Sequence, residues 1–215
     1  MNWRAPLDVY CERTDAGLWA EPVNALTNLA FLLVAVWLLR RMDRRTPADL
    51  RVLAGLIGAV GVGSGVFHTV AQTWAAVLDV VFIAIFVMVF LQRALVRLIG
   101  WRSMAANVAV LGMLVASAGI ALSVKLPALN GSELYLGPWL ALIALAVICP
   151  TPCARRWLIA AATLFGVSML CRSIDLLVCD AFPLGTHFGW HVNNALVLYC
   201  GMRALMTAPA RRLPC

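Results

Sequence analysis

The sequence predicts an all-α membrane protein, a bundle of seven transmembrane helices. Of its 215 residues, 63% are hydrophobic and only 13% are charged. The hydrophobic residues occur in long runs, and arginines stand in the short segments between them. Apolar runs of about 20 residues bounded by arginines are typical of helices that cross a bilayer.

The predicted spans follow one another with connections too short for a second folded domain. The first span begins at Glu21-Pro22, where proline suits the first helical turn. In chain order the spans cover residues 21–39, 52–70, 74–91, 105–124, 134–148, 157–178 and 186–205. We therefore divide the chain into an N-terminal extracytoplasmic segment (1–20), a seven-helix transmembrane domain (21–207) and a cytoplasmic tail (208–215).

The basic residues predict the orientation of the bundle. Nearly all of them fall on one side, in the first, third and fifth connections and the C-terminal flank: Arg40, Arg41, Arg44, Arg45, Arg51, Arg93, Arg97, Arg102, Arg155, Arg156, Arg203, Arg211 and Arg212. The other side holds only Arg4, Arg13 and Lys125. Basic loops stay in the cytoplasm, so the N-terminus is predicted outside and the C-terminus inside. Arginines in short loops do not form a nucleic-acid groove, and we expect no nucleic-acid partner.

Two of the three histidines in the chain stand at the start of the last span. His187 and His191 are four residues apart, so on a helix they lie one turn apart on the same face. Two imidazoles in this arrangement can bind one metal ion, and imidazole is a good ligand for zinc. Ionisable groups inside a membrane span are costly and usually functional.

The predicted topology places further polar residues at the same depth. The second span runs outward, so His68 lies near its outer end with Ser64 one turn deeper. The third span runs inward, so Asp79 lies near its outer end. The three histidines are therefore predicted to form one site beside a carboxylate and a hydroxyl.

A catalytic zinc site has three protein ligands, which can all be histidines, and a fourth position that is open to water or substrate. Zinc activates a water molecule and polarises a carbonyl group. Asp79 would then carry the proton, and Ser64 would donate a hydrogen bond to the developing oxyanion. The alternative is that the histidines are buried packing or proton-relay groups, and that Ser64 marks a contact between small residues.

Other polar residues in the spans have a structural interpretation. Asn24, Thr27, Asn28 and Asn194 are expected to join helices by hydrogen bonds. Arg172 and Asp175 are three residues apart near the outer end of the sixth span, where we expect an internal ion pair.

These residues resemble the alkaline ceramidase family, part of a superfamily of seven-span zinc hydrolases that includes the adiponectin and progestin receptor-like proteins. The resemblance rests on Ser64-x3-His68, Asp79 eleven residues later and His187-x3-His191. It extends to Tyr10-Cys11-Glu12, to the segment from Glu21-Pro22 to Thr27-Asn28, and to the segment from Ile174-Asp175 to Cys179. The fourth and fifth spans carry no motif of the family.

The resemblance implies a hydrolase that cleaves the amide bond of ceramide-like lipids and releases a sphingoid base and a fatty acid. His68, His187 and His191 would hold one zinc ion, Asp79 would be the general acid and base, and Ser64 would contact the oxyanion or substrate. The expected partners are a lipid substrate and the surrounding membrane lipids, with no obligate protein partner.

The resemblance also implies two features of the N-terminal segment. One is a disulfide between Cys11 and Cys179, both on the predicted outer side. The other is a calcium site known in some members, for which Glu12 and Glu21 match best, with Asp8, Thr14 and Asp15 as candidates for further ligands. The chain has an extra residue between Asp8 and Cys11 and fewer residues between Glu12 and Glu21 than the family pattern. A solvated acidic surface is therefore the alternative.

Three functions stay open from the sequence. The first is the zinc-dependent lipid amidase. The second is a receptor or sensor of the adiponectin-receptor type that holds zinc without turnover. The third is a transporter that relays protons through Asp79, Arg172 and Asp175, against which the absence of matching broken helices argues. The short loops and basic connections suggest a bacterial inner-membrane protein with its site near the extracytoplasmic face.

Overall fold

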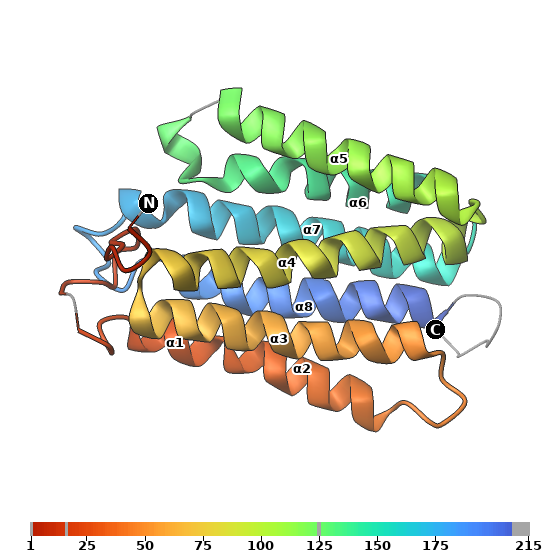
Figure 1. Ribbon diagram of the computed structural model, residues 1–215, viewed down its shortest axis with the longest axis horizontal. Helices are drawn as coiled ribbons and strands as arrows, with labels where there is room; N and C mark the ends of the chain where they lie inside the picture. Colours follow the sequence, from red (N-terminus) through yellow and green to blue (C-terminus); the bar gives the residue numbers. More distant parts are fainter. Residues whose placement is uncertain (1, 16, 124–125, 208–215) are drawn as a thin grey trace.

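A computed structural model describes residues 2–15, 17–123 and 126–207 of the chain, and these residues form a bundle of helices (Figure 1). The β-pairing found in this part of the chain is a single isolated bridge between Pro6 and Gln72. The predicted tail 208–215, with Arg211 and Arg212, and the connection residue Lys125 lie outside the described residues.

The helices follow the predicted order. They are α1 (Pro22–Thr27), α2 (Leu29–Arg40), α3 (Ala48–Val70), α4 (Thr73–Ala94), α5 (Ser103–Ser123), α6 (Leu136–Ile148), α7 (Pro152–Ile174) and α8 (His187–Met206). A π-helical turn, Leu95–Ile99, extends α4, and short 3-10 turns cover Pro127–Leu129, Ser132–Tyr135 and Asp175–Leu177.

Five of these segments are long and apolar enough to cross a membrane. They are Pro22–Arg40, Ala48–Val70, Thr73–Ile99, Ser103–Ser123 and Pro152–Leu177, and the apolar segment Ser132–Ile148 is shorter. Helix α8 has 20 residues and lies inside the bundle (Figure 1). The fold is thus that of an all-α membrane protein, while the count of seven spans and the orientation stay predictions.

The observed helices extend beyond the apolar runs. Helix α3 begins at Ala48 rather than at residue 52, and α7 begins at Pro152 rather than at residue 157. Proline at or just before the first turn favours these starts, so polar residues such as Asp49 join the helix. Helix α7 ends at Ile174, earlier than the predicted residue 178.

Helix α8 is the element around which the bundle packs. It lies along α7 for most of its length and also contacts α1, α2, α3 and α4. Helix α5 lies at the edge of the bundle beside α6 (Figure 1). Large apolar side chains are exposed on it every three or four residues, at Met104, Val108, Leu111 and Val115. Such an apolar outer face suits contact with lipid.

Helix α3 approaches α2 and α4 closely because it has glycine at both contacts. A Cβ atom on Gly61 would lie 2.7 Å from the Cβ of Phe31, and one on Gly63 would lie 2.7 Å from the ring of Phe82. Small residues let membrane helices pack at short distance. These contacts set the position of Ser64 and His68, which follow on the same helix.

We expect the substitution Gly61→Ala to lower the free energy of unfolding by about 1–3 kcal/mol, because an extra methyl group overpacks this contact. Gly55→Ala, in the same helix, is the matched control, since a Cβ there has no heavy atom within 4 Å. Thermal unfolding of both variants in detergent checks this expectation. Equal midpoints for the two variants would contradict the packing argument.

Candidate functional site

The three histidines lie together at one end of the bundle. His68 comes from the last turn of α3, and His187 and His191 come from the first turns of α8. One ring nitrogen of each lies within 4.8 Å of the other two. All three side chains are buried, each only 1% exposed. The prediction that the fold brings the three histidines together is confirmed.

A carboxylate orients the ring of His68. Oε2 of Glu21 lies 2.6 Å from Nδ1 of His68, and both groups are buried. Oε1 of the same carboxylate accepts a hydrogen bond from Nε of Arg13 at 2.6 Å. An ionised carboxylate can only accept, so Nδ1 of His68 donates to it, and Nε2 carries the lone pair of the neutral ring.

A hydroxyl group orients the ring of His191 in the same way. Oγ of Thr27 lies 2.9 Å from Nδ1 of His191. The same hydroxyl is 2.8 Å from the carbonyl oxygen of Val23, which takes its single proton. Thr27 therefore accepts a hydrogen bond from Nδ1 of His191, and Nε2 of this ring is also left without a proton.

The donor atoms of the site fit a metal ion. The Nε2 atoms of His68 and His191 face each other at 3.0 Å, a distance at which their lone pairs can share a proton or a metal ion. Two nitrogen ligands of a tetrahedral zinc ion lie about 3.3 Å apart, as Zn–N bonds of about 2.05 Å require. His187 Nδ1 is buried and has no hydrogen-bond partner among the described groups. Three imidazoles are a ligand set that zinc prefers.

An aromatic and cationic layer covers His187. The ring of Tyr10 stacks on His187, with centroids 3.5 Å apart and planes 15° apart. Burial raises the pKa of the Tyr10 hydroxyl well above its usual value, although Arg172 acts to lower it, so the phenol stays neutral. Arg172 donates to this hydroxyl and lies over the rings of Tyr10, Tyr135 and Trp190.

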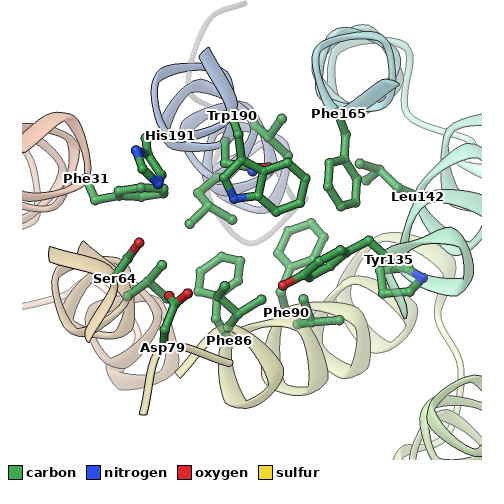
Figure 2. A pocket seen from close by; sticks show the side chains of 18 of the residues that line it. Phe31, Ser64, Asp79, Phe86, Phe90, Tyr135, Leu142, Phe165, Trp190 and His191 are labelled. Atoms are coloured by element: carbon green, nitrogen blue, oxygen red, sulfur yellow. The ribbon is translucent and has the colours of Figure 1, made fainter. Parts of the chain in front are cut away.

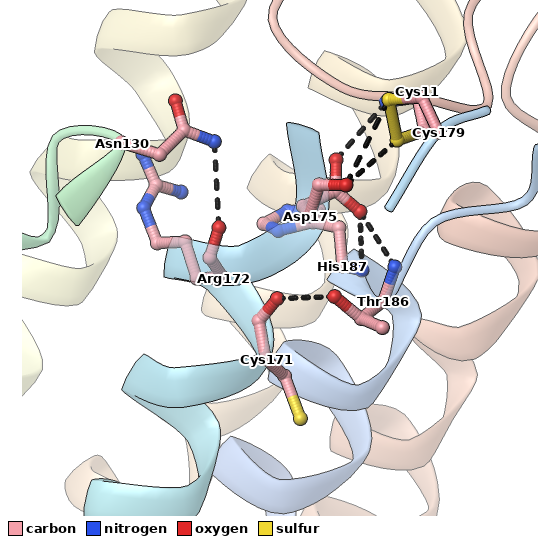
Figure 3. The surroundings of a disulfide bond; sticks show 8 residues. All are labelled: Cys11, Asn130, Cys171, Arg172, Asp175, Cys179, Thr186 and His187. Atoms are coloured by element: carbon pink, nitrogen blue, oxygen red, sulfur yellow. Dashed lines mark hydrogen bonds between the residues drawn. A yellow bond between two sulfur atoms is a disulfide. The ribbon is translucent and has the colours of Figure 1, made fainter. Parts of the chain in front are cut away.

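The predicted ion pair between Arg172 and Asp175 is wrong. Oδ1 of Asp175 accepts hydrogen bonds from the backbone N–H groups of Thr186 and His187, and Oδ2 accepts one from that of Cys11 (Figure 3). The carboxylate thus caps the start of α8, where free N–H groups and the helix dipole favour a negative charge. Helix α7 ends just before Asp175, so the two side chains do not share a helix face.

The N-terminal segment is attached to the rest of the bundle next to this site. Cys11 and Cys179 form a disulfide, the pair that the family resemblance implied (Figure 3). Gly185 adopts φ of +63°, and a side chain there would collide with Asp175 and Cys11. The backbone of the loop before α8 therefore packs directly against both residues.

An apolar cavity opens beside the histidines, inside the bundle. Ser64, Asp79 and His191 line its polar end (Figure 2). Aromatic and aliphatic side chains line the rest, among them Phe31, Phe86, Phe90, Leu142, Phe165 and Trp190. The structure thus places Ser64 and Asp79 at one end of the cavity with His191, while their catalytic roles stay predictions. Oδ1 of Asp79 has no hydrogen-bond partner among the described residues.

The family follows from a comparison with known proteins. The family model described as Ceramidase matches residues 10–211, which is most of the chain. The chain belongs to the ceramidase family. A search of curated proteins finds no match. Membership implies a hydrolase that acts on amide bonds, with a lipid as its substrate.

The calcium site implied by the resemblance does not fit this ceramidase-family protein. Both carboxylate oxygens of Glu12 accept N–H groups of α1, from Val23 at 2.6 Å and from Asn24 at 2.8 Å. Glu21 is bonded to Arg13 and His68. Asp8 and Asp15 are exposed. The acidic residues thus cap a helix, orient a histidine or lie in solvent rather than converge on one point.

Sequence reasoning missed four roles in the site. Glu21 was assigned to calcium but bonds to His68, and Thr27 was assigned to helix contacts but bonds to His191. Tyr10 stacks on His187, and Asp175 caps α8. For Thr27 and Tyr10 the available signal was their place in the N-terminal motif of the family. Their partners lie on other helices, so spacing along the chain could not identify them.

We expect Asp175→Ala to lower the free energy of unfolding by more than about 2 kcal/mol, because three backbone N–H groups lose their acceptor. Asp175→Asn should fall between the alanine variant and the wild type, since one acceptor oxygen remains. Asp180→Ala, at an exposed position, is the matched control. Thermal unfolding in detergent distinguishes them, and an Asp175→Ala midpoint equal to the control's contradicts the capping role.

Proposed function

We propose that the protein is a zinc-dependent intramembrane amide hydrolase that cleaves the N-acyl bond of ceramide or a ceramide-like lipid. The products are a sphingoid base, or another amine lipid, and a fatty acid. One observation carries the proposal. Three buried histidines present their coordinating nitrogens to one another next to Asp79 and Ser64, where an apolar cavity begins.

His68, His187 and His191 would hold the zinc ion, with Glu21 and Thr27 orienting two of the rings. Zinc bound by three imidazoles lowers the pKa of a water ligand and polarises a carbonyl group. The partners of the Nδ1 atoms raise the basicity of the ligands and keep the rings in place.

Asp79 transfers the proton, and Ser64 stabilises the oxyanion. The free carboxylate oxygen of Asp79 takes a proton from the attacking water as the new C–O bond forms, and returns it to the nitrogen as the C–N bond breaks. Ser64 donates a hydrogen bond to the carbonyl oxygen of the amide, where negative charge develops.

The cavity suits the acyl chain of such a lipid. His191 and Gly201 both line it and are ten residues apart on α8, a rise of about 15 Å. An extended chain advances about 1.2 Å per bond, so the cavity spans about a dozen carbon atoms. Phe90 packs against Gly201 at the far end from the histidines.

The proposal includes a location in the membrane. The loops joining α2 to α3, α4 to α5 and α6 to α7 lie at the end of the bundle opposite the histidines (Figure 1). Most of the arginines stand in these loops or in the helix turns next to them. The positive-inside rule therefore supports a site near the extracytoplasmic face. A lipid amide with a polar head at that interface would insert its acyl chain into the cavity.

The deciding experiment measures the zinc content of the purified protein and its hydrolysis of N-acyl lipids, beginning with ceramides. We expect about one zinc per chain, lost together with hydrolysis in the double variant His187→Ala/His191→Ala, because only one imidazole ligand then remains. Asn193→Ala, in the same helix, is the control and should keep both. A wild type without zinc, even after zinc addition, would refute the proposal, and zinc without turnover would favour the sensor.

Asp79→Asn should keep the zinc but reduce turnover by about 10²–10⁴-fold, because the amide cannot relay the proton. Ser64→Ala should reduce turnover by about 10²–10³-fold, the usual effect of removing one oxyanion donor. Turnover and zinc content of the same preparations check both expectations. An Asp79→Asn protein that hydrolyses its lipid at the wild-type rate would exclude Asp79 as the proton carrier.

A further inference from the structure

A buried guanidinium occupies the centre of the N-terminal segment. The Arg13 side chain is only 4% exposed, although the segment is short and lies at the end of the bundle (Figure 1). Its Nε donates to Oε1 of Glu21 at 2.6 Å. Its Nη1 donates to the carbonyl oxygens of Asp15, at 3.1 Å, and of Gly17, at 3.4 Å.

The groups around Arg13 are those that bind a hard metal cation. One carboxylate oxygen and two main-chain carbonyl oxygens surround the positive charge, and these are ordinary calcium ligands. Here the cation belongs to the chain itself. A calcium ion placed among the same oxygens would lie within a few ångströms of the guanidinium and would be repelled by it.

The guanidinium is also linked to the histidine site. Oε1 of Glu21 accepts from Arg13, while Oε2 accepts from Nδ1 of His68 at 2.6 Å and from Asn24 at 3.2 Å. The Glu21 side chain is 1% exposed. The hydrogen bond from Arg13 to Oε1 fixes the plane of the carboxylate and so the direction in which Oε2 faces His68. Arg13 thus holds the group that orients His68.

We propose that Arg13 is a built-in cation that replaces calcium in this protein and, through Glu21, keeps His68 in its metal-binding orientation. The proposal rests on the proposed zinc site. It makes Arg13 a positioning residue, which acts on a metal ligand through Glu21 and touches neither substrate nor metal. It also makes zinc binding independent of calcium.

The test compares zinc dissociation constants of the full-length protein in detergent, measured by competition with a chromophoric chelator. Arg13→Ala should bind zinc about 10–100-fold more weakly than the wild type, the usual effect of losing an outer-shell partner. Arg4→Ala, which removes an exposed arginine from the same segment, should leave the constant unchanged. Arg13→Lys, which keeps the charge but loses the planar donor geometry, should be intermediate.

A second arm of the test adds millimolar calcium to the wild type. We expect no change in the zinc dissociation constant and no shift in the thermal midpoint. A rise of the midpoint with calcium, or calorimetric binding of one calcium ion, would overturn the proposal. This arm needs no variant, so it decides the matter even if Arg13→Ala does not fold, which circular dichroism would reveal.

The two proposals fail in distinguishable ways. A wild type that binds no zinc refutes the hydrolase mechanism. A wild type that binds zinc, together with a folded Arg13→Ala that binds it equally tightly, refutes only the role of Arg13.

Discussion

Three imidazole rings lie buried at one end of an apolar bundle, and each polar group buried there needs a partner. Glu21 and Thr27 accept the Nδ1 protons of His68 and His191, so the Nε2 lone pairs of both rings turn toward the same point. The surrounding elements hold the acceptors of these hydrogen bonds in position. Helix α1 carries Thr27, and its first N–H groups are capped by Glu12.

The N-terminal segment is part of the site, although it lies outside the helices. The Cys11–Cys179 disulfide and the hydrogen bonds of Asp175 attach it to the start of α8. Tyr10 stacks on His187, and Arg13 contacts Glu21. A change in this segment therefore alters the orientation of two histidines. Tyr10 contacts His187 directly, and Arg13 contacts His68 through Glu21.

The bundle separates two apolar environments. The outer face of α5 is apolar toward the lipid, and the cavity beside the histidines is apolar toward the interior. Helix α3 brings Ser64 to the cavity and His68 to the other two histidines because Gly61 and Gly63 let it approach α2 and α4. The close packing at the two glycines thus places the hydroxyl of Ser64 beside an apolar cavity that suits an alkyl chain.

The sequence by itself determined the helical class, the order of the helices and the candidate residues of the site, since apolar runs, arginine loops and the His187-x3-His191 spacing are local signals. It also predicted the meeting of His68 with the α8 pair, because alternating span directions set their depth. Only the tertiary structure decided which groups form hydrogen bonds and ring contacts with these residues. The role of Thr27, the stacking of Tyr10, the turn of Asp175 away from Arg172 and the use of Glu21 by Arg13 all join different elements. Such contacts depend on how helices pack side by side, and spacing along one helix carries no information about its neighbour.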